Sequence, residues 1–154
     1  MRAQLKFPIF SFNPNNNVIY VCWSAKTYKT TDIKWLKKYN RRRYIVVDSV
    51  GMKYIVKQAY MVRWKGIHGF TGMNCNMIEV ENEYEEKIQK VSLYQLQEMI
   101  MERYPKSNEF HSQCWENIGD FKNRLFQCQT FEEVAELFRC RPSKNIFFKI
   151  WRGY

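Results

Sequence analysis

The sequence predicts an α+β domain, in which a mostly antiparallel sheet from the N-terminal half is packed by helices from the C-terminal half. Segments rich in β-branched and aromatic residues alternate with turn residues through the first half of the chain, as in successive strands. Two capping-box sequences lie beyond residue 90, each followed by apolar residues at helical spacing. Strands first and helices afterwards are typical of an α+β arrangement.

Size and composition favour one globular domain over residues 1–154. The chain is 45% apolar and 17% aromatic, and a domain of this length buries about 68–70% of its unfolded surface, so we expect it to fold without a disulfide or a metal. Its cysteines are odd in number and irregularly spaced, which favours free thiols and a reducing compartment. No apolar stretch approaches the ~18 residues of a membrane span, so we expect a cytoplasmic protein without a membrane partner. The five cysteines are Cys22, Cys75, Cys114, Cys128 and Cys140.

The first elements are two strands and a helix. We expect strands at Leu5 to Phe12 and Val18 to Trp23, separated by an Asn-rich turn with one proline. Apolar spacing predicts a short helix between Thr31 and Asn40, and either Thr31 or Asp32 can cap its first amides. The same spacing predicts that Trp35 and Tyr39 face the core.

A hairpin and a longer strand follow. Tyr44 to Val47 and Lys53 to Val56 flank a turn in which Gly51 supplies a positive φ. Along the longer strand, apolar and charged residues alternate. This alternation predicts that every second side chain faces the core, while Arg63 and Lys65 face water. That inward set is Tyr60, Val62 and Trp64.

The second half begins with a glycine loop at residues 66–72 and a strand at Met77 to Val80, followed by an acidic run. Ser92 with Gln95 predicts a capped helix that starts near Leu93 and ends before Pro105. Its inward stripe is Leu93, Leu96, Ile100 and Tyr104, and the next helix carries Ile118, Phe121, Leu125 and Cys128 on one face. Thr130 with Glu133 predicts a third helix, and Asn145 to Trp151 a closing strand.

Charge is the most informative feature for function. Residues 1–65 hold fourteen Lys and Arg against two Asp, a net charge of +12, whereas residues 66–104 hold three against seven, net −4. Self-repulsion of this size destabilises a fold, so an acidic partner explains it better than solubility does. The glutamates between Glu79 and Glu86 offer the competing explanation that the fold compensates its own charge. The predicted partner-binding residues are Lys34, Lys37, Lys38, Arg41, Arg42, Arg43, Arg63 and Lys65.

No motif indicates catalysis, a metal or a cofactor. The only histidines are His68, in the glycine loop, and His111. Neither stands beside a recognisable nucleophile motif, and the spacing of His111 and Cys114 supplies two ligands where a structural zinc needs four. We therefore predict a protein that is not an enzyme, with hydrolysis by either histidine as the remote alternative.

The general plan resembles small immunity proteins of bacterial polymorphic-toxin systems, including contact-dependent inhibition loci. The resemblance rests on Phe7-Pro8-Ile9-Phe10, the Val18 to Trp23 strand, the Tyr44 to Tyr54 hairpin around Asp48-Ser49-x-Gly51, and the capped helix after Val91. It implies a cytoplasmic protein that neutralises a cognate toxin domain by occluding its active or partner site. It carries over no site residues, because such proteins bind diverse toxins through diverse surfaces. Immunity proteins that face basic nuclease toxins tend to be acidic, so this basic chain implies a toxin with an acidic surface or one held by apolar contacts.

Two functions follow from these observations. The first is a non-enzymatic inhibitor that binds an acidic protein partner, a toxin domain above all. The alternative is a basic nucleic-acid-binding protein of a phage or mobile element, whose phosphate contacts would come from the same Lys and Arg residues.

Overall fold

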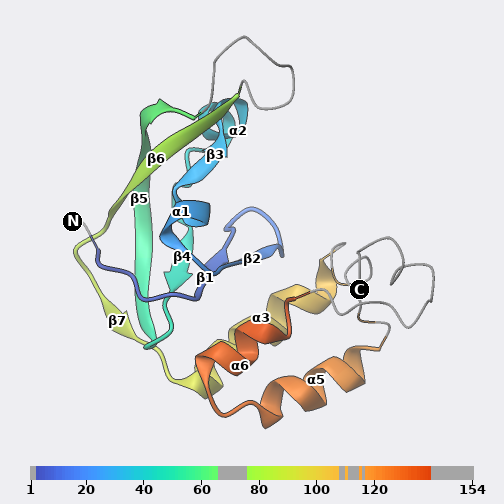
Figure 1. The fold of residues 1–154 in the computed structure, drawn as a ribbon. Coiled ribbons are helices and arrows are strands. Elements are labelled where there is room, and N and C mark those ends of the chain that lie inside the picture. Colours follow the sequence, from blue (N-terminus) through green and yellow to red (C-terminus); the bar gives the residue numbers. More distant parts are fainter. Residues whose placement is uncertain (1–2, 66–75, 108–109, 111–114, 116, 140–154) are drawn as a thin grey trace, which may run out of the picture.

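The computed structural model describes residues 3–65, 76–107, 110, 115 and 117–139. Its strands form one antiparallel sheet in the order β2-β1-β4-β5-β6-β3, with β7 paired beside the start of β5 (Figure 1). The strands are β1 (Ile9–Phe12), β2 (Ile19–Cys22), β3 (Thr30–Asp32), β4 (Ile45–Val47), β5 (Met52–Trp64), β6 (Met77–Tyr84) and β7 (Gln89–Lys90). The helices are α1 (Ala25–Tyr28), α2 (Ile33–Tyr39), α3 (Leu93–Arg103), α5 (Ile118–Gln127) and α6 (Phe131–Glu136), with a 3-10 turn at Tyr104–Lys106. The predicted α+β fold is confirmed.

The strand β5 connects the two ends of this architecture. Its first residues pair with β4 and β7, and the rest of the strand pairs with β6. Helices α3, α5 and α6 lie together at one end of the sheet, while α2 lies near the other end (Figure 1). The helical layer and the α2 region are therefore separate parts of the molecule.

Local sequence signals account for the hairpin and for the main helix. Gly51 has a φ of 80°, and the Asp48 carboxylate accepts hydrogen bonds from the amides of Val50, at 3.1 Å, and Met52, at 2.8 Å. At α3 both halves of the predicted capping box form between Ser92 and Gln95. The hairpin turn therefore determines where β5 begins, and the capping box determines where α3 begins.

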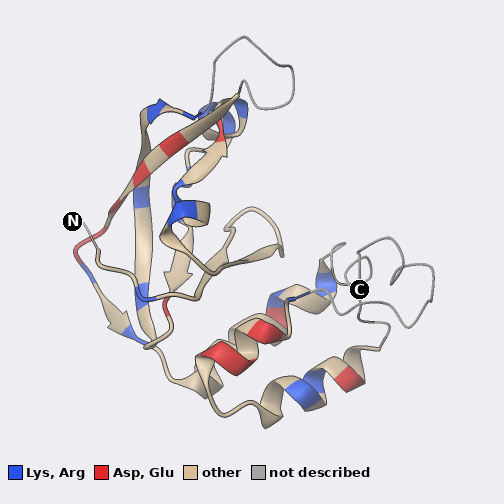
Figure 2. Ribbon diagram, in the orientation of Figure 1, with Lys and Arg blue, Asp and Glu red and all other residues tan. Residues whose placement is uncertain are grey.

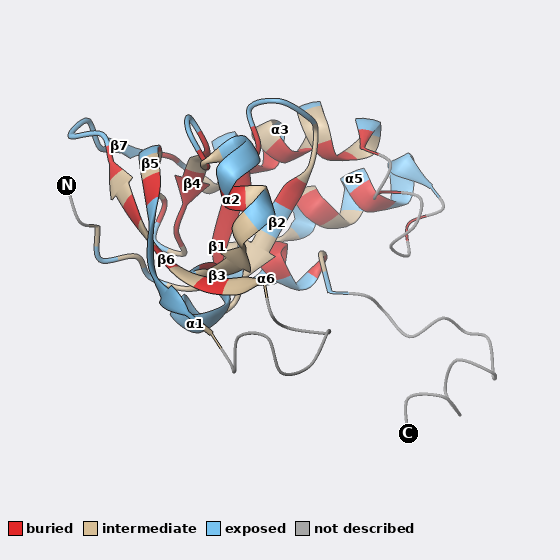
Figure 3. Ribbon diagram, turned by 90° about the horizontal axis from the view of Figure 1, so that it is seen from above, coloured by how far each residue is buried: buried red, intermediate tan, exposed pale blue. Residues whose placement is uncertain are grey.

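One face of the sheet packs against the helical layer. Phe10, Phe12 and Val47 from β1 and β4 join one buried cluster with side chains from α3, α5 and α6. Each of α3 and α5 carries a buried stripe beside exposed residues (Figure 3). The predicted inward positions are buried at Leu96, Ile100, Tyr104, Phe121 and Leu125; Leu93 and Cys128 are half-buried, and Ile118, the first residue of α5, is 45% exposed.

The opposite face of the sheet encloses a second cluster. Ile9 of β1 and Val46 of β4 pack there with the buried rings of Tyr28 and Tyr44. Farther along, Leu36 of α2 packs on the β5–β6 pair in a small third cluster with Ala59, Ile78 and Val80. Leu36, with the half-buried Ile33 packed against the same cluster, thus anchors α2 to the sheet.

The prediction that Tyr60, Val62 and Trp64 face the core is wrong. Their exposed fractions are 48%, 56% and 41%. The pairing of β5 with β6 shifts register between Val56 and Gln58, and such a bulge moves the inward positions of a strand by one residue. Ala59 consequently lies inward and Tyr60 outward, which strict alternation along the sequence does not predict.

Several further predictions have mixed outcomes. The helix α1 and the strand β3 were not predicted, because four and three residues are too short to show a period. Cys22 and Cys128 are free thiols. The glycine loop, both histidines, the other three cysteines and the closing strand lie outside the described residues. Over the part of the chain that the structure describes, no helix is long and apolar enough to cross a membrane.

Candidate partner-binding surface

The exposed cations form a surface on α2 and on the turn that follows it. Asp32 caps α2 by accepting hydrogen bonds from the amides of Lys34, at 2.7 Å, and Trp35, at 3.2 Å. Because Leu36 faces the sheet, the lysines of α2 project into solvent. We call the five exposed residues the basic surface: Lys34, Lys37, Lys38, Arg42 and Arg43.

Left-handed backbone positions shape the turn. Asn40, Arg41 and Arg43 have φ angles of 47°, 47° and 63°, a region in which Asn is at ease and Arg is uncommon. The Asn40 carboxamide accepts a hydrogen bond from the Ala59 amide at 2.8 Å, and the Arg43 amide donates to the Val56 carbonyl at 2.8 Å. Both bonds attach the turn to β5, so the arginines project from a fixed backbone.

The charge of the basic surface has no ion-pair partner among the residues that the structure describes. Lys38 lies over the ring of Tyr39, 5.1 Å from the centroid. In Figure 2 these positions colour α2 and the adjoining turn blue.

Arg63 and Lys65 take part in contacts within the fold. Arg63 is exposed and forms an ion pair with Glu79 at 2.6 Å, a hydrogen bond that holds the pKa of that carboxyl below its usual value. Lys65 is half-buried and donates to the Thr30 hydroxyl at 2.5 Å. These two predicted partner-binding residues therefore offer less free charge than those of α2.

Arg41 does not belong to the exposed surface. Its side chain is 9% exposed, and its Nη1 donates to the Tyr28 carbonyl at 2.8 Å. The guanidinium lies over the rings of Tyr28 and Trp35, 5.1 Å and 5.9 Å from their centroids. The expectation that all three consecutive arginines are exposed is wrong for Arg41, because aromatic packing and this hydrogen bond draw its side chain inward. Its contact with a partner stays a prediction.

The two aromatic residues of α2 are less buried than predicted. Trp35 is half-buried and packs against Tyr39 and Tyr44, with ring centroids 5.3 Å and 5.9 Å apart. Tyr39 is 37% exposed. Tyr39 thus adds an aromatic ring to the basic surface, which the helical spacing alone did not indicate.

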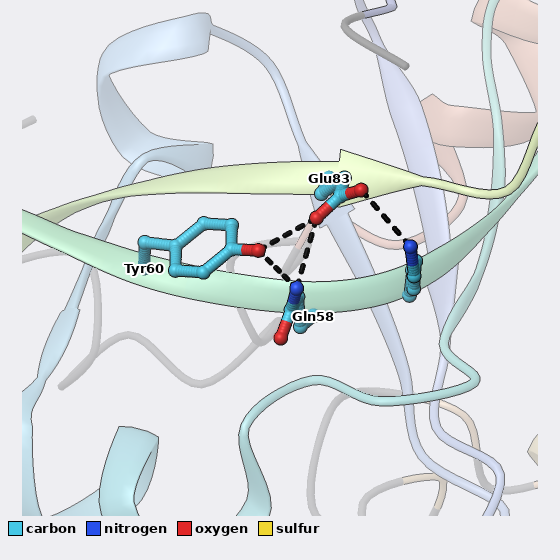
Figure 4. Close-up of polar contacts among 4 residues, drawn as sticks. Gln58, Tyr60 and Glu83 are labelled. Carbon is cyan, nitrogen blue, oxygen red and sulfur yellow. Dashed lines mark hydrogen bonds and ion pairs between the residues drawn. The ribbon is translucent and has the colours of Figure 1, made fainter.

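The acidic residues of β6 are engaged on another part of the sheet. Glu83 accepts hydrogen bonds from Gln58 at 2.9 Å and from Tyr60 at 2.6 Å, and it pairs with Lys57 at 3.2 Å (Figure 4). Gln58 and Tyr60 also contact each other. These donors, Gln58 first, lower the pKa of Glu83 to about 2. Glu79 and Glu83 therefore compensate charges of β5 and form no ion pair with the basic surface.

Two further findings concern metal ligands and similarity to known proteins. No group of His, Cys, Asp and Glu able to hold a metal occurs among the described residues. Comparison with known proteins gives no match: no family model fits the chain, and no curated protein or solved structure is similar to it. The arrangement itself is a cluster of exposed positive charges on α2 and the turn that follows it.

Proposed function

We propose that this chain acts by binding, as a cytoplasmic inhibitor whose basic surface contacts an acidic face of a protein partner. The observation that carries the proposal is the set of five exposed cations on a capped helix and the turn after it, none of which pairs with an acidic residue in the described part of the chain. Complementary charge accelerates the encounter of two proteins and excludes wrong partners. An exposed aromatic ring among cations, as at Tyr39, is typical of the residues that dominate binding energy.

A toxin domain is the partner that we propose. The resemblance to immunity proteins supports this choice, and it implies that binding would occlude the active or partner site of the toxin. The acidic surface would have to lie on the toxin, since the cations lie on this chain.

Nucleic acid is the second candidate, and the exposed Tyr39 is the observation that favours it. Lysines and arginines that neutralise phosphates give a strongly salt-dependent affinity, and an exposed ring can stack on an unpaired base. The same five cations would serve either partner, so affinity measurements must separate the two.

The test compares two variants of equal charge change. Lys37→Glu/Lys38→Glu reverses the basic surface, and Lys87→Glu/Lys90→Glu reverses two exposed lysines beside β7, at the far end of β5. Each variant is titrated with labelled single-stranded and duplex DNA and RNA from low to physiological salt. Where a large secreted protein is encoded immediately upstream of this chain, each variant is also tested against the C-terminal domain of that protein.

We expect weak nucleic-acid binding that disappears at physiological salt. Binding to the neighbouring domain should be slowed by Lys37→Glu/Lys38→Glu, while the β7 variant behaves like the parent protein. Sub-micromolar nucleic-acid binding at physiological salt that collapses only in the α2 variant would refute the inhibitor proposal and favour the second candidate. Equal effects of both variants would mean that the basic surface is not the contact.

A further inference from the structure

A cavity of about 320 Å³ lies between the two edge strands of the sheet. Tyr20 and Cys22 of β2 line it together with residues of β3, and α1 joins those two strands in sequence (Figure 1). Its volume falls at the lower end of the range for small-molecule sites. Rings from Tyr28 and Trp35 make part of its wall, and Ser11, Thr27, Thr30 and Thr31 add hydroxyl-bearing side chains to the lining.

Arg41 supplies a buried positive charge at this cavity. Arginine is almost never so deeply buried unless it is paired, yet its guanidinium has no ion pair with any residue that the structure describes. One of its five N–H donors is taken by the Tyr28 carbonyl. The others find no acceptor among the described residues, although Arg41 lines the cavity.

Tyr44 supplies a second donor without an acceptor. Its side chain is 3% exposed and lines the same cavity. Its hydroxyl is buried and has no hydrogen-bond partner within the described part of the chain. Burial raises the pKa of Tyr44. The phenol therefore stays protonated, and its O–H can donate a hydrogen bond to an anion.

The carboxylate nearest at hand is engaged elsewhere. Asp32 also lines the cavity, but one of its carboxylate oxygens caps α2 through the amides of Lys34 and Trp35. The backbone of Arg41 has a left-handed φ of 47°. Strained conformations of this kind cluster at ligand sites. The cavity is thus lined by Arg41 and Tyr44, whose remaining hydrogen-bond donors have no acceptor among the described residues.

We infer that this cavity binds a small organic acid, whose carboxylate meets Arg41 and Tyr44 and whose apolar part lies against Tyr28 and Trp35. The planar guanidinium fork fits the two oxygens of a carboxylate. A phosphate dianion fits less well, since among the described lining residues Arg41 is the one cation and Asp32 stands beside it as an acid. The site differs from the basic surface in its residues, because none of Lys34, Lys37, Lys38, Arg42 and Arg43 is among the described residues that line it.

The probe is benzoate, with benzamide as its uncharged counterpart, each titrated into the full chain by calorimetry and by thermal melting. We expect benzoate to bind and to raise the melting temperature, and benzamide to bind at least about tenfold more weakly because it lacks the charge. Tyr44→Phe should weaken benzoate by a factor of about 3 to 10, the value of one hydrogen bond. Arg41→Gln should abolish binding, and Lys87→Glu/Lys90→Glu, which changes two lysines that do not line the cavity, should leave it unchanged.

Three results would overturn the inference. They are no benzoate binding at millimolar concentration, equal binding of benzoate and benzamide, and unchanged binding in Tyr44→Phe. Tyr44→Phe keeps the test valid even if Arg41→Gln fails to fold, because it removes only an unpaired hydroxyl. A capped Gly-Glu-Gly peptide that binds more tightly than benzoate and competes with it would place the carboxylate on a protein and refute the free acid.

Discussion

Replacing Phe121 with alanine tests the helical layer most directly. The ring is fully buried on α5, and four other rings surround it. Their centroids lie 5.0 Å from that of Phe121 for Trp115, 5.3 Å for Tyr104, 5.5 Å for Phe110 and 6.3 Å for Phe138. Phe121→Ala removes the shared contact of all four.

The expected loss follows from this packing. Phe→Ala in a core costs about 3–5 kcal/mol, the larger values belonging to sites that cannot collapse onto the cavity. Rings held against one another relax little, and each aromatic pair adds about 0.5–1.5 kcal/mol beyond buried area. We therefore expect about 4–5 kcal/mol, a large part of the ~5–15 kcal/mol that stabilises a typical domain.

The assay is urea unfolding followed by tryptophan fluorescence and by far-UV circular dichroism. With an m value of about 2 kcal/mol/M, the midpoint should fall by roughly 2 M. Ile118→Ala is the matched control, because Ile118 begins the same helix and is 45% exposed, and it should cost less than about 1 kcal/mol. Equal midpoints for the two variants would refute the placement of Phe121 at the centre of this core.

Three further predictions concern turns, caps and pH. Gly51→Ala should lower the free energy of unfolding by roughly 1–3 kcal/mol, because alanine is strained in a left-handed backbone. The loss should be larger still, because the added carbon would lie 2.5 Å from the Val91 carbonyl oxygen. Thermal melts of Gly51→Ala, with the exposed Val50→Ala as control, measure the loss. Ser92→Ala breaks both halves of the α3 capping box and should cost about 0.5–2 kcal/mol in the same melts, so an unchanged melting temperature would contradict the cap. The pKa of Glu83, lowered from 4.5 to about 2, means that its contribution to stability is complete above pH 4.5 and fades as pH falls towards 2; carbon-detected NMR titration gives the pKa directly, and Glu83→Gln should flatten the pH dependence of stability in that window.

The accuracy of the sequence predictions depends on how local each feature is. The hairpin around Gly51 and the capped start of α3 depend on residues within a few positions of one another, and both are present. The fate of Arg41 depends on the Tyr28 carbonyl thirteen positions earlier and on the ring of Trp35. A run of three arginines indicates exposure, and only tertiary packing shows that the first of them is buried.

The strand β5 shows a second limit. Alternation along a strand predicts which side chains face the core only while the strand stays in register with its neighbour. In β5 the register of pairing with β6 shifts after Val56. The alternation of Tyr60, Val62 and Trp64 in the sequence does not indicate that shift. The cavity between β2 and β3 was missed for a similar reason, since its lining comes from segments that meet only when the sheet curls.

The separation between α2 and the helical layer has a consequence for how this sequence can evolve. The outward residues Lys34, Lys37 and Lys38 belong to none of the three buried clusters, so folding places little constraint on their identity. Phe121 and Leu96, at the opposite end of the molecule, are fixed by packing. The charge of the α2 face can therefore drift or reverse over generations without a loss of fold, and it can follow the changes of whatever surface it meets.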